Sequence, residues 1–252
     1  MRALILAAGF GSRLMPLTKD KPKCMVEYQG KKIIDYELEA LNGAGISKIA
    51  VVCGYLGNVL REYLKEKYHL SDFYTNSKYD ITNMVQTLFC ARKWLESCVE
   101  NKEDLIISYA DIVYFKDIIA KLKGVKYPLS IVVDKEWRSL WEKRFSEPLS
   151  DAETLKIENG KIIELGRKPK SYDEIMGQYI GLFKISYEFL PQVLMTYDEL
   201  DRSGNYDGKD FLNMYMTSFL QVLIEKYKSA CAVEIFGNWC EIDFKGDLDV
   251  VL

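Results

Sequence analysis

The chain has very little of what builds the commonest metal and redox sites. Its 252 residues include one histidine, His69, and six cysteines that form no Cys-x-x-Cys pair. A structural zinc site needs four closely spaced His and Cys ligands, so the sequence argues against one. Several cysteines lie inside apolar runs, as in Val51–Cys53. We therefore expect reduced, buried thiols and a location in the cytoplasm.

Excess basic charge and long hydrophobic runs are missing too. Lysine and arginine number 34 against 37 aspartate and glutamate, which gives a net charge of −3. Proteins that bind nucleic acids usually present a basic surface, so nucleic acid is not an expected partner. No apolar run is long enough to span a membrane, and no secretory signal is recognisable. There is also no repeat, linker or low-complexity tract, so we expect one domain over residues 1–252.

Two standard phosphate-binding motifs are absent, but the N-terminal segment carries a related pattern. Gly9–Gly11 lacks the third glycine of the dinucleotide fingerprint, and the chain has no P-loop. An apolar run over Ala3–Ala8 leads into a loop of small residues, which Arg13 and Lys23 follow. Such a loop lets backbone N–H groups approach phosphate, and two cations beyond it suit a nucleoside triphosphate. From the glycines alone, a strand followed by an ordinary loop remains the alternative.

The spacing of apolar residues predicts alternating strands and helices in the first half of the chain. The expected strands cover 3–8, 48–53, 72–75, 105–109 and 129–134, and the expected helices cover 33–44, 57–68, 84–95 and 116–123. Such alternation is typical of a doubly wound, mostly parallel α/β sheet.

After residue 134 the pattern changes to a smaller lobe of hairpin and helices. A hairpin over 154–165 is expected, because Asn159-Gly160 is the strongest short turn signal. The other expected strands are 179–185, 232–236 and 240–244, and the other helices are 188–200 and 211–227. We expect this lobe to cover the carboxyl edge of the sheet, where ligands of open α/β sheets bind.

Three acidic residues lie where strands of the expected sheet end. Asp111 follows the strand at 105–109, and Glu241 and Asp243 share one face of a late strand because side chains alternate. Carboxylate oxygens at the ligand edge suit Mg²⁺. From the residues alone, an aspartate at a strand end more often caps the next helix.

The N-terminal segment resembles the signature of the nucleotidyltransferases that activate sugar phosphates and choline phosphate. The matching residues are Leu6-Ala-Ala-Gly-Phe-Gly-Ser-Arg-Leu-Met-Pro-Leu-Thr and Pro22-Lys-Cys-Met25. The resemblance implies a Rossmann-like, GT-A-like fold, with the nucleotide in residues 1–134 and the acceptor in 135–252. It also implies attack by an acceptor phosphate oxygen on the α-phosphorus of a nucleotide. Lys23, Arg13 and Asp111 would be catalytic, and Asp111 and Asp243 would hold Mg²⁺, with a secondary role for Glu241.

The same resemblance implies a nucleotide site formed by the glycine-rich loop and by residues from other segments. The expected nucleotide-binding residues are Leu6, Ala7, Ala8, Gly9, Gly11, Ser12, Arg13, Lys23, Gly54, Asn83 and Ala110. Ala110 stands where many relatives have glycine, and its methyl group narrows the approach to the nucleotide. Asn83 is equally suited to cap a helix, and the two roles can coexist.

The length of the chain and the segment 76–88 resemble the small cytidylyltransferases that use choline phosphate or aminoethylphosphonate, so CTP is the expected nucleotide. Further segments, such as Ser108–Phe115 and Gln178–Phe183, resemble the cytidylyltransferases that act on L-glutamine phosphate in capsular phosphoramidate biosynthesis. The expected products are CDP-L-glutamine and pyrophosphate, made by a monomer or a homodimer.

Other functions remain open. The acceptor could be choline phosphate, aminoethylphosphonate or a sugar 1-phosphate, and a non-catalytic nucleotide-binding regulator is a further alternative. The presence of all four expected catalytic and metal-binding residues argues against the regulator.

The acceptor site is expected from the chemistry of an amino-acid phosphate. A carboxylate suits a guanidinium and an ammonium suits a carboxylate, so we expect Arg138 and Arg144 to hold the carboxylate and Glu153 the ammonium. Lys168 would face the phosphate. The complete expected set is Trp137, Arg138, Arg144, Glu153, Lys168, Gln178 and Tyr179. The alternative for the Arg–Trp cluster is a solvated helix surface.

Overall fold

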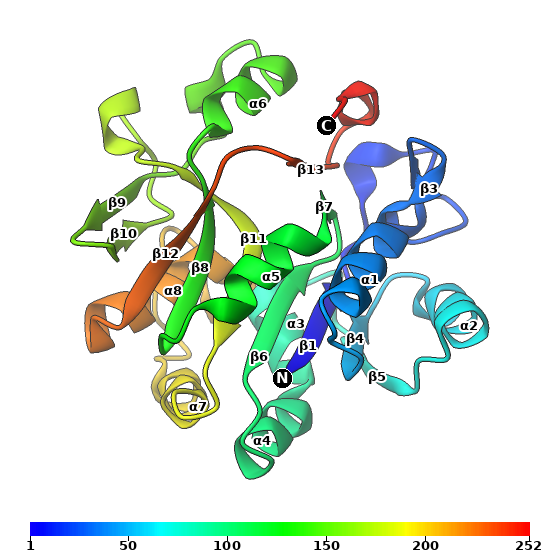
Figure 1. Ribbon diagram of the computed structural model, residues 1–252, viewed down its shortest axis with the longest axis horizontal. Coiled ribbons are helices and arrows are strands. Elements are labelled where there is room, and N and C mark those ends of the chain that lie inside the picture. The colour runs from blue at the N-terminus through cyan, green and yellow to red at the C-terminus, as the bar shows by residue number, and fades with distance from the viewer.

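A computed structural model describes residues 1–252 and centres on a nine-stranded sheet, ordered β5-β4-β1-β6-β11-β8-β12-β10-β9 (Figure 1). Its strands are β1 (Arg2–Ala7), β4 (Ile49–Cys53), β5 (Asp72–Thr75), β6 (Leu105–Tyr109), β8 (Leu129–Asp134), β9 (Leu155–Glu158), β10 (Lys161–Leu165), β11 (Gln178–Ile185) and β12 (Ala230–Ile235). β5, β4, β1 and β6 are parallel, β8 and β12 run the same way, and β11 lies antiparallel between β6 and β8. The expected mixed, mostly parallel α/β sheet is confirmed.

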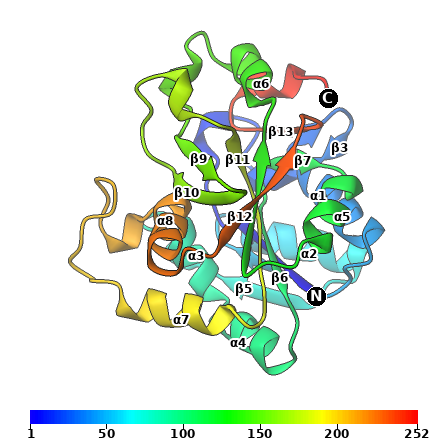
Figure 2. The same cartoon turned by 60° about the vertical axis from the view of Figure 1, so that its left-hand side comes forward.

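Helices cover both faces of this sheet. They are α1 (Ile33–Gly43), α2 (Gly57–Tyr68), α3 (Met84–Cys90), α4 (Arg92–Glu100), α5 (Lys116–Gly124), α6 (Trp137–Arg144), α7 (Leu190–Glu199) and α8 (Met216–Tyr227). Figure 2 shows α1 and α5 on one face and α3 and α8 on the other. None of these helices is long and apolar enough to cross a membrane.

The alternation of side chains along β1 explains why its apolar run is continuous. Ala3, Ile5 and Ala7 belong to one buried cluster, with α1 and α5, whereas Leu4 and Leu6 belong to the other, with α3 and α8. A central parallel strand is covered on both faces and therefore has no polar side. This double burial fixes the loop that follows Ala7 at the carboxyl edge.

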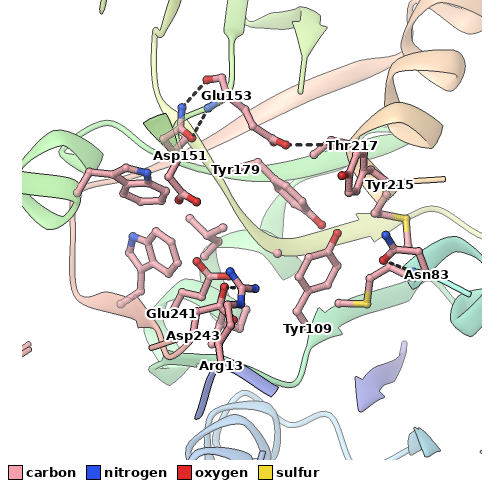
Figure 3. A pocket seen from close by; sticks show the side chains of 18 residues that line it. Arg13, Asn83, Tyr109, Asp151, Glu153, Tyr179, Tyr215, Thr217, Glu241 and Asp243 are labelled. Atoms are coloured by element: carbon pink, nitrogen blue, oxygen red, sulfur yellow. Dashed lines mark hydrogen bonds and ion pairs between the residues drawn. The ribbon is translucent and has the colours of Figure 1, made fainter. Parts of the chain in front are cut away.

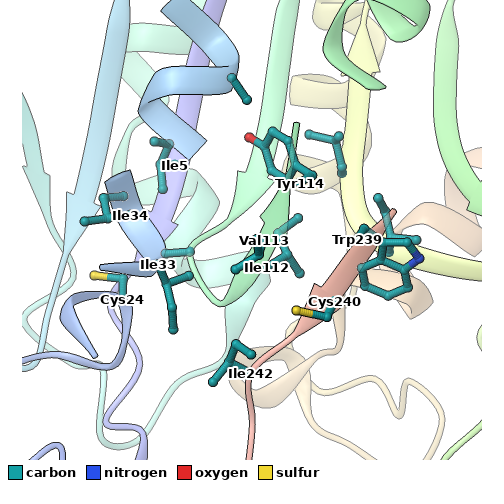
Figure 4. Packing of buried hydrophobic residues seen from close by; sticks show 14 of the residues in the cluster. Ile5, Cys24, Ile33, Ile34, Ile112, Val113, Tyr114, Trp239, Cys240 and Ile242 are labelled. Carbon is teal, nitrogen blue, oxygen red and sulfur yellow. The ribbon is translucent and has the colours of Figure 1, made fainter. Parts of the chain in front are cut away.

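A small second sheet closes the carboxyl edge. In this sheet β7 (Ile112–Tyr114) pairs antiparallel with β13 (Trp239–Glu241). A separate short hairpin is formed by β2 (Glu27–Tyr28) and β3 (Lys31–Lys32). Figure 4 shows Ile112 and Val113 packed beside Cys240 and Ile242, with Cys24 in the same cluster. This core joins the N-terminal loop to the last strand.

Several expected boundaries are wrong, and tertiary hydrogen bonds explain the largest difference. The helix expected over 211–227 is a 3₁₀ turn at Phe211–Asn213 followed by α8 from Met216. The carbonyl of Leu212 accepts from the backbone N–H of Asn83 (3.0 Å), and the carbonyl of Asn213 accepts from the side-chain amide of Asn83 (3.3 Å). These two bonds hold Leu212 and Asn213 against the start of α3, in a turn that precedes α8.

Other differences are smaller. The helix expected over 84–95 is broken at Ala91 into α3 and α4. The strand expected over 240–244 ends at Glu241, because the backbone N–H groups of Asp243 and Phe244 both donate to Asp247. β7 and α6 were not expected as separate elements.

Candidate active site

The glycine-rich loop after β1 packs closely against the segment that carries Lys23. Gly11 has a left-handed backbone, with φ of 65°, and a Cβ there would lie 2.9 Å from the Cβ of Lys23. The Thr18 hydroxyl donates to the Gly11 carbonyl (3.0 Å). Only glycine meets both demands, so the loop can approach Lys23 at the edge of the sheet.

Lys23 lies at the centre of a set of ion pairs. Its Nζ donates to Asp111 Oδ2 at 2.8 Å and to Asp243 Oδ1. The Arg13 guanidinium pairs with the other oxygen of Asp243, at 2.7 Å. Burial disfavours the charged ammonium, but the surrounding carboxylates outweigh it and raise the pKa of Lys23 above its usual value. Lys23 is therefore a fixed positive charge at neutral pH.

Three carboxylates meet around this ammonium. Asp111, Glu241 and Asp243 each offer one oxygen, and these oxygens lie within 4.8 Å of one another. The backbone N–H of Ile242 donates to the Asp111 carbonyl (2.9 Å), which holds the two segments together. Burial, followed by the charges of Asp243 and Asp111, raises the pKa of Glu241 above its usual value, against the opposing effects of Arg144 and Lys23.

The carboxylate cluster fits a divalent cation by two observations. The Asp111 Oδ1 atom is buried and makes no hydrogen bond, although a buried carboxylate oxygen normally has a partner. The Lys23 ammonium bridges Asp111 and Asp243, so a positive charge already lies between them. An all-oxygen set of this kind suits Mg²⁺ and provides no soft ligand.

Two pockets meet at this cluster. The loop pocket is lined by Leu6, Ala7, Gly9, Lys23, Cys24, Met84, Ala110 and Asp111. The large pocket encloses about 330 Å³ and includes Arg13, Asn83, Met84, Tyr109, Glu153, Tyr179, Thr217, Glu241 and Asp243 in its wall. Met84 lines both pockets, and the Lys23–Asp243 ion pair joins a residue of one to a residue of the other.

The structure brings most of the expected nucleotide-binding residues to these pockets. Gly54 lies behind the loop instead, where a Cβ would come 2.4 Å from the carbonyl oxygen of Ala8. Ser12 is exposed at the start of a 3₁₀ turn. Asn83 caps α3, accepting from the Met84 N–H at 2.8 Å, and also lines the large pocket. Met84 was missed, although it directly follows that cap.

The large pocket contains three of the expected acceptor residues. Figure 3 shows Glu153 bonded to Thr217 on one side, with the side chain of Tyr179 between Glu153 and Tyr109. Burial raises the pKa of Glu153 to about 7, although the Thr217 hydroxyl opposes the shift. Gln178 is the third, and Tyr109, Tyr215 and Thr217 were missed.

The remaining expected acceptor residues do not line the large pocket. Trp137 packs against Trp141 and Tyr172. The exposed Arg138 pairs with Glu142 one turn along α6 (2.8 Å), and Lys168 donates to the backbone carbonyls of Leu149 and Ser150.

Arg144 lies on the buried side of α6 and not in the pocket. Its side chain is 1% exposed and bonds Glu241 at 3.1 Å and Asp247 at 2.9 Å. Because these carboxylates occupy its donors, α6 presents no free guanidinium to the pocket. The helix is amphipathic, with Arg138 outside and Arg144 inside, so the clamp expected from these two arginines is not formed.

Comparison with known proteins identifies the family to which this arrangement of loop, lysine and carboxylates belongs. A family model described as nucleotidyl transferase matches residues 2–134, which include Arg13, Lys23 and Asp111. The chain belongs to the nucleotidyl transferase family. The resemblance of the N-terminal string is thereby confirmed, and the protein is an enzyme of the nucleotidyltransferase class.

Individual nucleotidyl transferases match over different lengths. A CTP:phosphoglutamine cytidylyltransferase of Campylobacter jejuni is 66% identical over 250 residues, which cover 99% of this chain and 98% of the relative. A choline-phosphate cytidylyltransferase of Streptococcus pneumoniae is 38% identical over 121 residues, covering 47% of this chain and 48% of the relative.

Solved structures show the same fold at lower identity. The CTP:phosphocholine cytidylyltransferase of Streptococcus pneumoniae aligns over 98% of this chain and 96% of its own, with a TM-score of 0.75 and 23% identity. An inositol-1-phosphate CTP transferase of T. maritima aligns over 98% of this chain and 90% of its own, with a TM-score of 0.75 and 18% identity.

In this nucleotidyl transferase, the burial of Arg144 predicts a role in stability. Arg144→Ala leaves the buried carboxylate of Asp247 without its cation, and breaking a buried ion pair in this way costs about 3–5 kcal/mol of the free energy of unfolding. Arg138→Ala removes an exposed ion pair and an exposed contact with the Tyr172 ring, so it should cost much less. Urea unfolding of both variants measures the difference, and equal losses would contradict this assignment.

Proposed function

We propose that this nucleotidyl transferase is a Mg²⁺-dependent cytidylyltransferase that converts CTP and L-glutamine phosphate to CDP-L-glutamine and pyrophosphate. The observation that carries the proposal is the meeting of two pockets at one cluster of lysine and carboxylates. The 66% identity to a CTP:phosphoglutamine cytidylyltransferase over nearly the whole of both chains supports both substrates.

The proposed reaction needs no protein nucleophile. An oxygen of the acceptor phosphate forms a bond to the α-phosphorus of CTP, while the bond from that phosphorus to the bridging oxygen breaks. Pyrophosphate leaves with the electron pair of the broken bond. Because both reactants are anionic, catalysis consists mainly of positioning them and neutralising their charge.

The residues at the junction have complementary roles in this proposal. Lys23 holds the acceptor phosphate and the α-phosphate together, and Arg13 holds the β- and γ-phosphates. Backbone N–H groups of the loop at residues 9–12 add neutral donors. The two cations already lie on opposite oxygens of Asp243, which fixes their separation before substrates bind.

Asp111 and Asp243 are the proposed Mg²⁺ ligands, with Glu241 beside them. The bound ion supplies positive charge against the phosphate oxygens. Arg144 and Asp247 fix the positions of these ligands, because Arg144 bonds Glu241 and Asp247 accepts from the Asp243 N–H at 2.7 Å. We further propose a cytoplasmic location, which agrees with six free cysteines.

A sugar 1-phosphate is the second candidate acceptor, since family members with this fold include sugar-phosphate enzymes. The large pocket argues against it, because Asp151 and Glu153 add negative charge that a sugar does not need.

Pyrophosphate release from a panel of nucleotides and acceptors tests the proposal. We expect turnover with CTP and L-glutamine phosphate in the presence of Mg²⁺, and little or none when UTP or dTTP replaces CTP. Choline phosphate, 2-aminoethylphosphonate and glucose 1-phosphate complete the panel. Preferred use of UTP or dTTP with a sugar phosphate would overturn the proposed substrates while leaving the family unchanged.

A further inference from the structure

The wall of the large pocket has more acidic than basic residues, and two of the acidic ones belong to neither the nucleotide site nor the metal site. Four of its wall residues are acidic, Asp151, Glu153, Glu241 and Asp243, and one is basic, Arg13. Glu241 is paired with Arg144, and Asp243 with Lys23 and Arg13. Asp151 and Glu153 form no ion pair. The acceptor side of the pocket therefore has carboxylate without a matching cation.

Glu153 is held in place on both its backbone and its side chain. The Gln178 amide brackets the backbone, because its Oε1 accepts from the Glu153 N–H at 3.1 Å and its Nε2 donates to the Glu153 carbonyl at 2.6 Å. The Thr217 hydroxyl donates to Glu153 Oε1 at 3.3 Å. The second carboxylate oxygen, Oε2, makes no hydrogen bond within the protein. Figure 3 shows these contacts at one end of the pocket.

A second polar group of the pocket wall, the Tyr179 hydroxyl, points toward the Tyr109 hydroxyl and away from Glu153 (Figure 3). The Tyr179 hydroxyl is buried and makes no hydrogen bond, and its ring lies edge-on to that of Tyr109, with the ring centres 5.7 Å apart. Buried hydroxyls are normally satisfied, so an unsatisfied one in a pocket wall marks a place for a ligand group. An ammonium has three N–H donors and no acceptor, which suits the free Oε2 of the Glu153 carboxylate.

We propose that Glu153 binds the ammonium group of the acceptor, so that the enzyme selects phosphates that also carry a positive charge. Gln178 is a positioning residue that acts through the Glu153 backbone. This inference rests on the proposed function, in which the acceptor is an amino-acid phosphate. Since a charged partner stabilises the ionised carboxylate, the pKa of Glu153, which burial raises to about 7, falls when the ammonium binds.

The choice of acceptor in the panel separates this inference from the proposed function. Turnover with choline phosphate or 2-aminoethylphosphonate, in place of L-glutamine phosphate, would overturn the proposed acceptor but agree with selection by positive charge. Preferred turnover with glucose 1-phosphate would overturn the selection by charge.

The direct test compares L-glutamine phosphate with its analogue in which hydrogen replaces the α-ammonium. With the wild-type enzyme we expect the KM for the analogue to be roughly 10- to 100-fold higher than the KM for L-glutamine phosphate. This factor corresponds to the loss of one hydrogen bond between charged groups. Equal KM values for the two acceptors would overturn the inference, and this arm needs no variant protein.

Variants of the two residues identify the group responsible. Glu153→Gln should raise the KM for L-glutamine phosphate by a similar factor and leave the KM for the analogue and for CTP unchanged. Gln178→Met should raise the same KM by a smaller factor with little change in kcat, which a loss of folded protein would not produce. The matched control is Glu158→Gln, the same substitution at an exposed residue of β9, which should leave all three KM values unchanged. A Glu153→Gln enzyme that still distinguishes the two acceptors would overturn the assignment.

Discussion

Lys23→Met should lower kcat roughly 100- to 1,000-fold, the usual cost of losing one well-placed charged donor. The Lys23 ammonium touches Asp111 and Asp243 and lies at the junction of the two pockets, where the reacting phosphates converge. Methionine has a similar length but no charge. Steady-state pyrophosphate release at saturating substrates measures the loss.

The variant must be shown to fold, because removing Lys23 leaves three carboxylates close together. The control is the thermal unfolding temperature measured in excess Mg²⁺, because the ion restores positive charge to the cluster. Lys93→Met, an exposed change of the same type on α4, should keep full activity. Near-normal turnover by a folded Lys23→Met enzyme would contradict the role given to the ammonium.

The second large effect is expected at the metal ligands. Asp111→Asn keeps the shape of the side chain but removes a negative charge from the set formed with Glu241 and Asp243. We expect kcat/KM to fall by at least about 100-fold, since metal stabilisation of phosphate charge is worth several kcal/mol. The Mg²⁺ concentration that gives half-maximal rate should rise.

A direct binding measurement separates loss of metal from loss of activity. Calorimetric titration with Mn²⁺ should show weaker binding to Asp111→Asn than to the wild type, and Asp173→Asn, an exposed change, should bind as the wild type does. Removing divalent ions with a chelator should abolish turnover, and re-addition should restore it. Undiminished Mn²⁺ binding by Asp111→Asn would contradict the assignment.

Much of the fold could be predicted because its signals are local. β1 and β6 are parallel neighbours, so the residues that follow them, the loop at Gly9 and Asp111, had to meet at the same edge of the sheet. The meeting of Lys23 with Asp111 and Asp243 was predicted only through the family resemblance. It depends on the pairing of β7 with β13, which joins positions more than a hundred residues apart.

The acceptor site was less predictable, because the decisive contacts are tertiary. Arg138 and Arg144 belong to one short helix and have the same chemistry, yet one is exposed and the other is 1% exposed against Asp247. Helical spacing places Arg144 on the face of the buried Trp137 and Trp141, but the carboxylates that pair with it come from distant segments and could not be inferred locally. Gln178 was correctly placed at the pocket, but its bonds to the Glu153 backbone could not be inferred from either residue alone.

The measurement that most directly tests the account is the fate of CTP labelled at its α-phosphorus. After incubation with L-glutamine phosphate and Mg²⁺, the label should appear in CDP-L-glutamine, and the pyrophosphate released in equal amount should be unlabelled. Such a result would establish both the acceptor and the bond that breaks. Labelled CDP or CMP without a glutamine adduct would show transfer to water or attack at another phosphorus, and would contradict the account.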